Sequence, residues 1–158
     1  MRQSISPLVV VTAEPYEPTE FARQVSAGDA GALVTFTGLC RSEDGRLSAL
    51  ELEHYPSMAE KMLRRMAESC IARHDLSALA VLHRSGLVHV GEPIVTVVAA
   101  ARHRAEAFDG AMQLMDFLKT DAPFWKREHP VGGAAGRWVG AVERDDRARR
   151  RWDTTPES

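Results

Sequence analysis

The segment IVTVVAAA, residues Ile94–Ala101, is almost entirely apolar and follows directly after Pro93. A short, unbroken apolar run of this kind is typical of a strand that is buried on both faces of a sheet. We therefore expect a central strand over Pro93–Ala101, with other elements covering both sides of it.

Two amphipathic helices are expected to cover this sheet. The first begins at Pro56, because proline is tolerated in the first turn of a helix. Its apolar stripe is interpreted as core, with a cofactor site as the alternative, and consists of Met58, Met62, Leu63, Met66 and Cys70. The second runs from about Ala105 to Lys119, and its apolar face consists of Ala107, Phe108, Ala111, Leu114, Met115 and Leu118.

The rest of the chain contains shorter segments with strand character and one short helix, expected from about Glu20 to Ala27, where Gly28 ends it. The other expected strands are Leu8–Thr12 at a sheet edge, Gly31–Gly38, Leu47–Tyr55, Leu79–His83, Phe124–Glu128 and Arg137–Val142. Gly31–Gly38 and Leu47–Tyr55 are expected to pair as a hairpin with a long loop. The sequence RSGLVHVGE before Pro93 is expected to be a connection with glycine turns.

The order of these elements also predicts the fold class. Strands and helices do not alternate regularly along the chain, and this favours an α+β fold. Residues 1–143 are expected to form a single domain. Residues 144–158 are expected to be a charged tail that is partly disordered.

The composition limits the classes of protein to which the chain can belong. Its 158 residues are 44% hydrophobic and 27% charged, as in an ordinary globular domain. The net charge of -2 argues against a general nucleic-acid binder. No apolar run approaches the roughly 18 residues of a membrane span, and the N-terminus has no secretory cleavage pattern. The 2 cysteines form neither a disulfide framework nor a metal cluster, which favours the reducing cytoplasm.

Cationic side chains gather around an aromatic kernel in FLKTDAPFWKRE, residues Phe117–Glu128. Lys119 is expected at the end of the preceding helix, because Pro123 stops that helix, and Lys126 is expected on the following strand. The turn between them can bring both amines to one pocket. A lysine next to other cations loses its proton more easily, which suits it for acid–base or covalent chemistry.

Two other segments place cations where a strand ends. Arg41 follows Gly31–Gly38, and Arg102, His103 and Arg104 follow the central strand. If the fold brings these groups to the lysines, the pocket suits a phosphate or another anion, because guanidinium groups bind phosphate oxygens in pairs. The alternative is that each cation is a solvated surface residue, and spacing alone does not decide between the two.

The residue pattern indicates neither a metal site nor a resident cofactor. The 6 histidines show no paired ligand spacing, and His103, as a lone histidine, is more often structural. Cys40 is interpreted as a small buried residue, with a thiolate activated by Arg41 as the alternative. The chain also has no P-loop, no GxGxxG and no GxSxG motif.

Five motifs follow one another from about Gly31 to Val139: TFTGLCR, LELEHYPSMAEK, AARHRAEAF, FLKTDAPFWKRE and GRWV. In this order and at this spacing, they resemble the family of molybdopterin synthase large, catalytic subunits. The resemblance implies a hammerhead-type α+β fold with a mixed, largely antiparallel sheet covered by helices.

The resemblance also implies an activity and a set of partners. Two large subunits would form a homodimer, and each would bind a small ubiquitin-like sulfur carrier, which gives a heterotetramer. The carrier's C-terminal Gly-Gly thiocarboxylate would enter a pocket near the dimer interface, which can take residues from both protomers. Sulfur would pass to cyclic pyranopterin monophosphate and form the dithiolene of molybdopterin. Since the sulfur arrives on the carrier, the enzyme needs no cysteine nucleophile.

The motif positions that match the family imply a set of site residues. Lys119 is expected to transfer protons at the carbons that receive sulfur, and Lys126 to hold the thiocarboxylate and the negative charge that develops. Arg41, His103 and Arg104 are expected to bind phosphate and pterin. The full set is Arg41, His103, Arg104, Lys119, Lys126, Arg127 and Glu128.

Two other functions compete with this prediction. The first is a non-catalytic homologue that binds the carrier or an anionic ligand without turnover, and the presence of both lysines and of the His103–Arg104 pair argues against it. The second is a phosphate-ester hydrolase that uses the same cations, and the absence of a recognisable metal set or nucleophile in the sequence argues against that.

Overall fold

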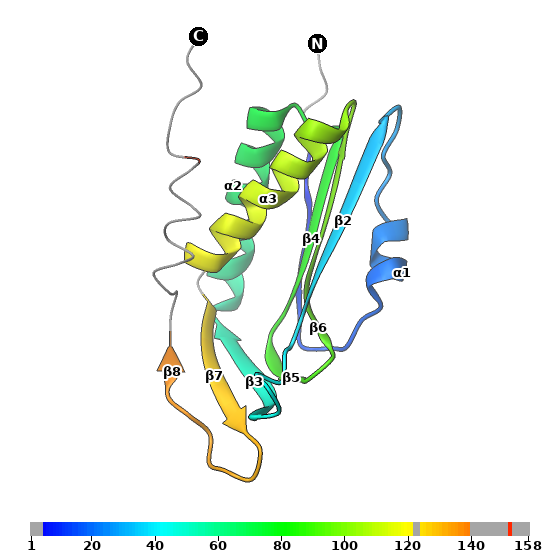
Figure 1. The fold of residues 1–158 in the computed structure, drawn as a ribbon. Coiled ribbons are helices and arrows are strands. Elements are labelled where there is room, and N and C mark those ends of the chain that lie inside the picture. Colours follow the sequence, from blue (N-terminus) through cyan, green and yellow to red (C-terminus); the bar gives the residue numbers. More distant parts are fainter. Residues whose placement is uncertain (1–4, 122–123, 140–151, 153–158) are drawn as a thin grey trace.

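Helices and strands of this chain gather around the predicted central strand (Figure 1). The structure is a computed structural model, and it describes residues 5–121, 124–139 and 152. The mixture of helices with largely antiparallel strands confirms the α+β class. In chain order the elements are β1 (Leu8–Thr12), α1 (Pro18–Arg23), β2 (Ala32–Leu39), β3 (Leu47–His54), α2 (Pro56–His74), β4 (Ala78–Arg84), β5 (Gly86–His89), β6 (Pro93–Ala101), α3 (Arg104–Thr120), β7 (Phe124–Pro130) and β8 (Trp138–Val139).

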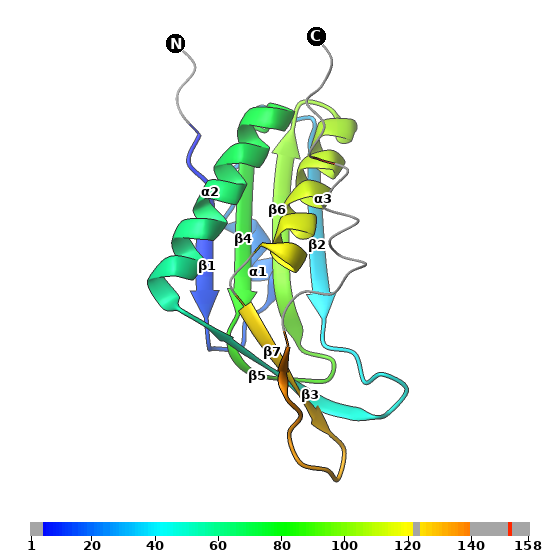
Figure 2. The ribbon, with the colours of Figure 1, turned by 90° about the vertical axis from the view of Figure 1, so that its left-hand side faces the viewer.

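Four strands form a first sheet in the order β1-β4-β6-β2. Strand β1 runs parallel to β4, whereas the pairs β4–β6 and β6–β2 are antiparallel. Every residue of β6 from Val95 to Ala101 is buried, as expected for a central strand. Figure 2 shows α2 and α3 across one face of this sheet and α1 behind it, which explains the burial of β6 on both faces.

The main core lies between the first sheet and helices α2 and α3. Because successive side chains of a strand alternate between its faces, Leu79 and Val81 of β4 point to these helices, and Ala80 and Leu82 point to α1. Burying a single leucine stabilises the folded state by about 1.5–3 kcal/mol. The two helices contribute Leu63, Met66, Ala67, Cys70, Ala107, Ala111, Leu114 and Leu118 to this core.

Helix α2 begins at Pro56, as the sequence predicts. The interpretation of its methionine stripe as core is confirmed along most of the helix, where Leu63, Met66 and Cys70 are buried. Met58, in the first turn, is exposed instead. None of the helices in the described residues is long and apolar enough to cross a membrane.

Helix α1 starts earlier and is shorter than expected from the sequence. It spans Pro18–Arg23 rather than about Glu20 to Ala27. The fixed φ of Pro18 suits the first helical position, which moves the start of the helix. Gly28, with a φ of 56°, lies in the connection to β2 and does not end the helix. Phe21 is the buried anchor of this short element.

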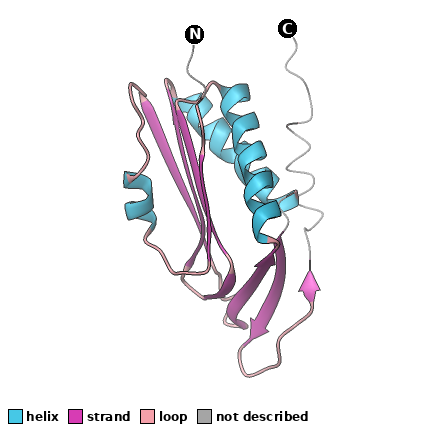
Figure 3. Cartoon of the chain, turned by 180° about the vertical axis from the view of Figure 1, so that it is seen from behind, coloured by secondary structure: helices cyan, strands magenta, loops and turns pink. Residues whose placement is uncertain are grey.

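The expected hairpin between Gly31–Gly38 and Leu47–Tyr55 is wrong, because the two strands belong to different sheets. Strand β2 pairs with β6, whereas β3 pairs with β5 and β7 in a second sheet of order β5-β3-β7-β8. Strand β5 occupies part of the segment that the sequence predicts to be a connection. It has only 4 residues, and Gly86 starts it at a φ of 74°. Because glycine is typical of turns, the sequence indicates a turn here and not a strand. Figure 3 shows the second sheet at one end of the molecule, beyond the C-terminal end of α3.

Candidate active site

A cleft lies where the end of α3 meets the first and the second sheet. Its inner cavity, about 90 Å³, is largely apolar and is also lined by Lys119 and Lys126. An adjoining outer cavity of about 310 Å³ is lined by the same two lysines together with Arg41, Glu43 and Glu128. Pockets that hold small ligands typically measure about 300–1,000 Å³, so the outer cavity is large enough for a small ligand.

Two elements position the lysines. Lys119 lies in the last turn of α3, and Lys126 lies on β7, where it is paired with the buried Leu52 of β3. The two amines therefore share one cleft, as the sequence predicts. Helix α3 ends at Thr120, and the predicted stop at Pro123 falls on residues 122–123, which lie outside the described residues.

The inner cavity suits a narrow, extended chain that ends in a negatively charged group. Its walls include Leu50, Leu52 and Ile94, and these apolar side chains replace part of the water next to the lysines. In such surroundings the attraction between an ammonium group and an anion is stronger than in bulk water. An extended chain that ends in an anion would therefore be held with that anion at the lysines.

The outer cavity has a mixed rim of cations and carboxylates. Arg41 pairs with Glu43 at 3.0 Å, and Arg46 donates a hydrogen bond of 2.9 Å to Glu128. The Arg41 side chain is 77% exposed. Exposed ion pairs of this kind contribute only about 0–1 kcal/mol, so Arg41 can exchange Glu43 for an entering phosphate at little cost.

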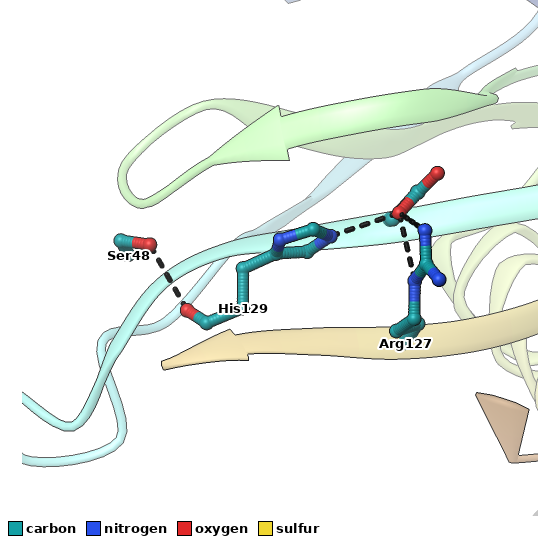
Figure 4. A network of polar contacts seen from close by, with 4 residues as sticks. Ser48, Arg127 and His129 are labelled. Atoms are coloured by element: carbon teal, nitrogen blue, oxygen red, sulfur yellow. Dashed lines mark hydrogen bonds and ion pairs between the residues drawn. The ribbon is translucent and has the colours of Figure 1, made fainter. Parts of the chain in front are cut away.

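Arg127 lies on the face of the second sheet opposite to Lys126, because neighbouring residues of a strand point to opposite faces, and Figure 4 shows its polar contacts. Its Nε and Nη2 donate hydrogen bonds of 2.9 and 2.6 Å to Glu51, and His129 Nε2 donates one of 2.8 Å to the same carboxylate oxygen. The hydrogen bond from Arg127, followed by that from His129, lowers the pKa of Glu51. The Arg127 guanidinium also stacks 4.6 Å from the ring centroid of Trp138. Arg127 thus organises the reverse face and does not line the cleft.

His103 and Arg104 lie at the other end of α3 from Lys119. His103 is the N-cap of the helix and Arg104 its first residue. With a rise of about 1.5 Å per residue, the helix separates Arg104 from Lys119 by about 22 Å. A single chain therefore brings together Arg41, Lys119, Lys126 and Glu128 of the expected set, and it leaves His103, Arg104 and Arg127 outside the cleft.

The inner cavity is lined by one titratable residue that the sequence analysis does not single out. His83 lines the inner cavity with both lysines and is only 7% exposed. Its ring stacks on Phe124 with 3.9 Å between centroids, and its Nδ1 donates a hydrogen bond of 2.7 Å to the carbonyl oxygen of Arg84. Burial, followed by the positive charges nearby, lowers the pKa of His83 from 6.5 to about 4. Leu79, Val81 and His83 are alternate residues of β4, so they point to the same face. This alternation is the sequence signal that places His83 on the side of α2 and α3.

The lowered pKa of the buried His83 leads to a prediction about the pH dependence of stability. Between pH 6.5 and about pH 4, the unfolded chain binds a proton at His83 that the folded chain does not bind, so stability falls as the pH falls through this window. The loss is about 3 kcal/mol. Urea unfolding at about pH 7 and about pH 4 should show a loss that is larger in the wild type than in His83→Phe by about this amount, because the variant has no proton to bind there. Equal losses in both proteins would contradict the prediction.

Comparison with known proteins identifies the family. The model of the family described as MoaE protein matches residues 11–121. The chain belongs to this family. MoaE relatives named molybdopterin synthase catalytic subunit include one from Brucella melitensis, 57% identical over 79% of this chain and 77% of the relative. Another, from Mesorhizobium japonicum, is 46% identical over 99% of this chain and 100% of the relative. The Escherichia coli relative is 40% identical over 91% of this chain and 97% of its own length.

Solved structures of MoaE proteins have the same fold. The molybdopterin biosynthesis MoaE protein from Burkholderia ambifaria superposes with a TM-score of 0.80 at 35% identity, over 94% of this chain and 99% of that one. At 20% identity, a chain from the complex of subunits 1 and 2 of molybdopterin-converting factor of Helicobacter pylori superposes with a TM-score of 0.66, over 87% of this chain and 90% of that one. The hammerhead-type α+β fold expected from the sequence is thereby confirmed.

Proposed function

We propose that this MoaE chain is the catalytic subunit of a molybdopterin synthase and transfers sulfur from a carrier's C-terminal thiocarboxylate to cyclic pyranopterin monophosphate. The observation that carries the proposal is the narrow inner cavity with Lys119 and Lys126 inside a cleft whose rim holds Arg41. The names of relatives that are 40–57% identical support the same reaction.

The shape of the cleft suits the delivery of sulfur by a second protein. A flexible C-terminal Gly-Gly segment has no side chains, so it fits the narrow inner cavity, and its thiocarboxylate would end between the two ammonium groups. The solved complex of two subunits of molybdopterin-converting factor contains a chain with this fold and supports a small-subunit partner. We place the pterin and its cyclic phosphate in the outer cavity, with the phosphate at Arg41.

The two lysines would then divide the chemistry. Lys126 neutralises the thiocarboxylate and the charge that develops when its sulfur adds to a carbon of the substrate. Lys119 supplies and removes the protons as the sulfur adds and the oxygen substituent leaves that carbon. Water then hydrolyses the bond between this sulfur and the carrier's acyl carbon, which releases the carrier as a carboxylate and leaves the sulfur on the substrate. No step uses a metal or a cysteine nucleophile. Cys40 and Cys70 are both free and buried, as is compatible with the cytoplasmic location that we propose.

A second copy of the chain would complete the site. Strand β2 is an edge strand, and Leu33 and Leu39 on it are each 54% exposed. Phe108, one turn after Arg104 on the neighbouring α3, is 60% exposed. Leu39 lines the cleft, and Leu33, which pairs with Ala100, lies at the end of β2 near the start of α3. Antiparallel pairing of two β2 edges about a two-fold axis would bring the Arg104 end of each protomer to the cleft of the other.

The β2 edge can be tested directly. Leu33→Asp should convert the dimer to monomers, because dimerisation would bury an unpaired carboxylate at a cost of about 3–5 kcal/mol. Size-exclusion chromatography with light scattering measures the change. The control is Leu87→Asp, an exposed leucine on β5 in the other sheet, which should leave the dimer intact. A dimer that survives Leu33→Asp would rule out this interface.

Reconstitution with purified components tests the proposed reaction. The chain is mixed with a thiocarboxylated carrier and cyclic pyranopterin monophosphate, and molybdopterin is measured as its fluorescent oxidation product. Product is the expected result. Carrier binding without product would instead favour the alternative of a binding-only homologue, and the anion pocket would then serve recognition alone.

A further inference from the structure

His83 occupies the last position of a row of core residues that faces α2 and α3. Leu79 and Val81 precede it on the same face of β4 and pack in the main core. At the next position on that face the core gives way to the inner cavity, and His83 is one of its walls together with Lys119. A polar side chain at this depth needs a partner, because burying an unpaired hydrogen-bonding group costs about 1–3 kcal/mol.

One nitrogen of the ring has its partner within the strand. The carbonyl oxygen of Arg84 can only accept a hydrogen bond, so His83 Nδ1, 2.7 Å away, carries the hydrogen. In the neutral ring Nε2 then has a lone pair and acts as an acceptor. Phe124, 3.9 Å from the ring between centroids and nearly parallel to it at 18°, fixes the ring plane. The tautomer and the orientation of His83 are therefore both set before any ligand binds.

Burial keeps this ring neutral, and the charged groups around His83 act in the same direction. Lys119 of α3 acts on it most strongly among the charges, followed by His54 of β3 and Lys126 of β7, and all three oppose a positive charge on the imidazole. Burial acts in the same direction and is the largest cause of the lowered pKa of about 4. At neutral pH His83 thus offers the inner cavity a fixed acceptor and not a further positive charge.

We infer that His83 is a positioning residue for Lys119 and that its Nε2 accepts a hydrogen bond from the Lys119 ammonium during turnover. A lysine side chain has several rotatable bonds, and a fixed acceptor at the wall of the cavity selects the arrangement in which the amine faces the reacting carbon. This inference rests on the proposed function, since it assigns a role within the same reaction.

Two substitutions separate this role from simple packing. His83→Phe keeps an aromatic ring against Phe124 and removes the acceptor, whereas His83→Gln loses the ring stack and can place an amide oxygen near the position of Nε2. In the reconstituted reaction, His83→Phe should lower kcat by about 10- to 100-fold with little change in KM, as expected for the loss of a hydrogen bond to a charged group. His83→Gln should retain more activity than His83→Phe. The reverse order would show that His83 only packs, and would overturn the inference.

The pH–rate profile gives a second readout. An acceptor stabilises the charged form of the amine, so its removal in His83→Phe should move the alkaline limb of the kcat profile to lower pH. His83→Gln should move this limb less. A profile of unchanged shape and position in His83→Phe would contradict a role that acts through Lys119.

A titration that does not depend on activity distinguishes failure of this inference from failure of the proposed function. The ring of His83 is followed by NMR in the wild type, in Lys119→Ala and in Lys61→Ala, where Lys61 is an exposed lysine on α2. Removal of the Lys119 charge should raise the pKa of His83 from about 4, and removal of Lys61 should not. If Lys119→Ala leaves the titration of His83 unchanged, the two groups are not coupled and the inference fails, whether or not molybdopterin is formed.

Discussion

Lys119→Ala should abolish measurable formation of molybdopterin in the reconstituted system while the protein remains folded. The expected loss is at least about 100- to 10,000-fold, the usual contribution of a positioned acid–base group. Lys119 lies at the surface of a preformed cavity at the end of α3, and truncation there removes the amine without removing a core side chain. Initial rates of product fluorescence measure the effect, and the far-ultraviolet circular dichroism spectrum reports on the fold.

The chain offers a matched control for this substitution. It contains three lysines, Lys61, Lys119 and Lys126, and Lys61 is exposed on α2, outside the residues that line the cleft. Lys61→Ala should have the wild-type rate. Carrier binding should survive Lys119→Ala, because most of the contact with the carrier would lie outside the inner cavity. A Lys119→Ala protein with a normal rate would remove Lys119 from the mechanism and leave Lys126 as the candidate.

Mixed dimers should recover activity that neither parent variant has. Arg104→Ala alone should lower the rate by about 10- to 100-fold, because a charge-assisted hydrogen bond to the substrate is lost. Lys119 and Arg104 lie at opposite ends of α3, so in the proposed dimer each cleft takes Lys119 from one protomer and Arg104 from the other. Random reassembly of Arg104→Ala with Lys119→Ala chains would give mixed dimers in which one cleft is intact, and about a quarter of the wild-type activity.

The control for this experiment is the mixture that cannot complement. Chains that carry both substitutions, reassembled with Lys119→Ala chains, contain no intact Lys119 and should stay inactive. If Arg104 acted within its own protomer, every cleft of the first mixture would lack one residue, and no activity would return. The activity of the mixed dimers therefore decides between the two arrangements independently of the absolute rate.

The sequence predicts local structure well where the local signal and the tertiary packing agree. The apolar run of β6, the start of α2 at Pro56 and the joint position of Lys119 and Lys126 all depend on local patterns, and the structure confirms them. The strand that pairs with β2 cannot be predicted from a local pattern. Both β3 and β6 offer it a strand with suitable side chains, and the choice between them depends on burial across the whole sheet, which no local pattern records.

The same distinction explains which site residues could be placed. Strand alternation would have separated Lys126 and Glu128 from Arg127, because neighbouring residues of a strand face opposite sides, yet the motif as a whole was assigned to the pocket. No local pattern singles out His83, because it is an isolated histidine without paired ligand spacing. Its role depends on the cavity beside it, and a cavity is formed by elements far apart in the sequence.

The two faces of strand β7 restrict where codons can be inserted or deleted in the gene. Lys126 faces the cleft, and Arg127 holds Glu51 on the reverse face, so each position of this strand belongs to one of two unrelated environments. Loss of one codon before Lys126 would exchange the two faces for the rest of the strand, with Arg127 in the cavity and the ion-pair network broken. The connection between β7 and β8 has no such constraint. Insertions and deletions among natural variants should therefore accumulate between Pro130 and Trp138 and be absent from Phe124–Glu128.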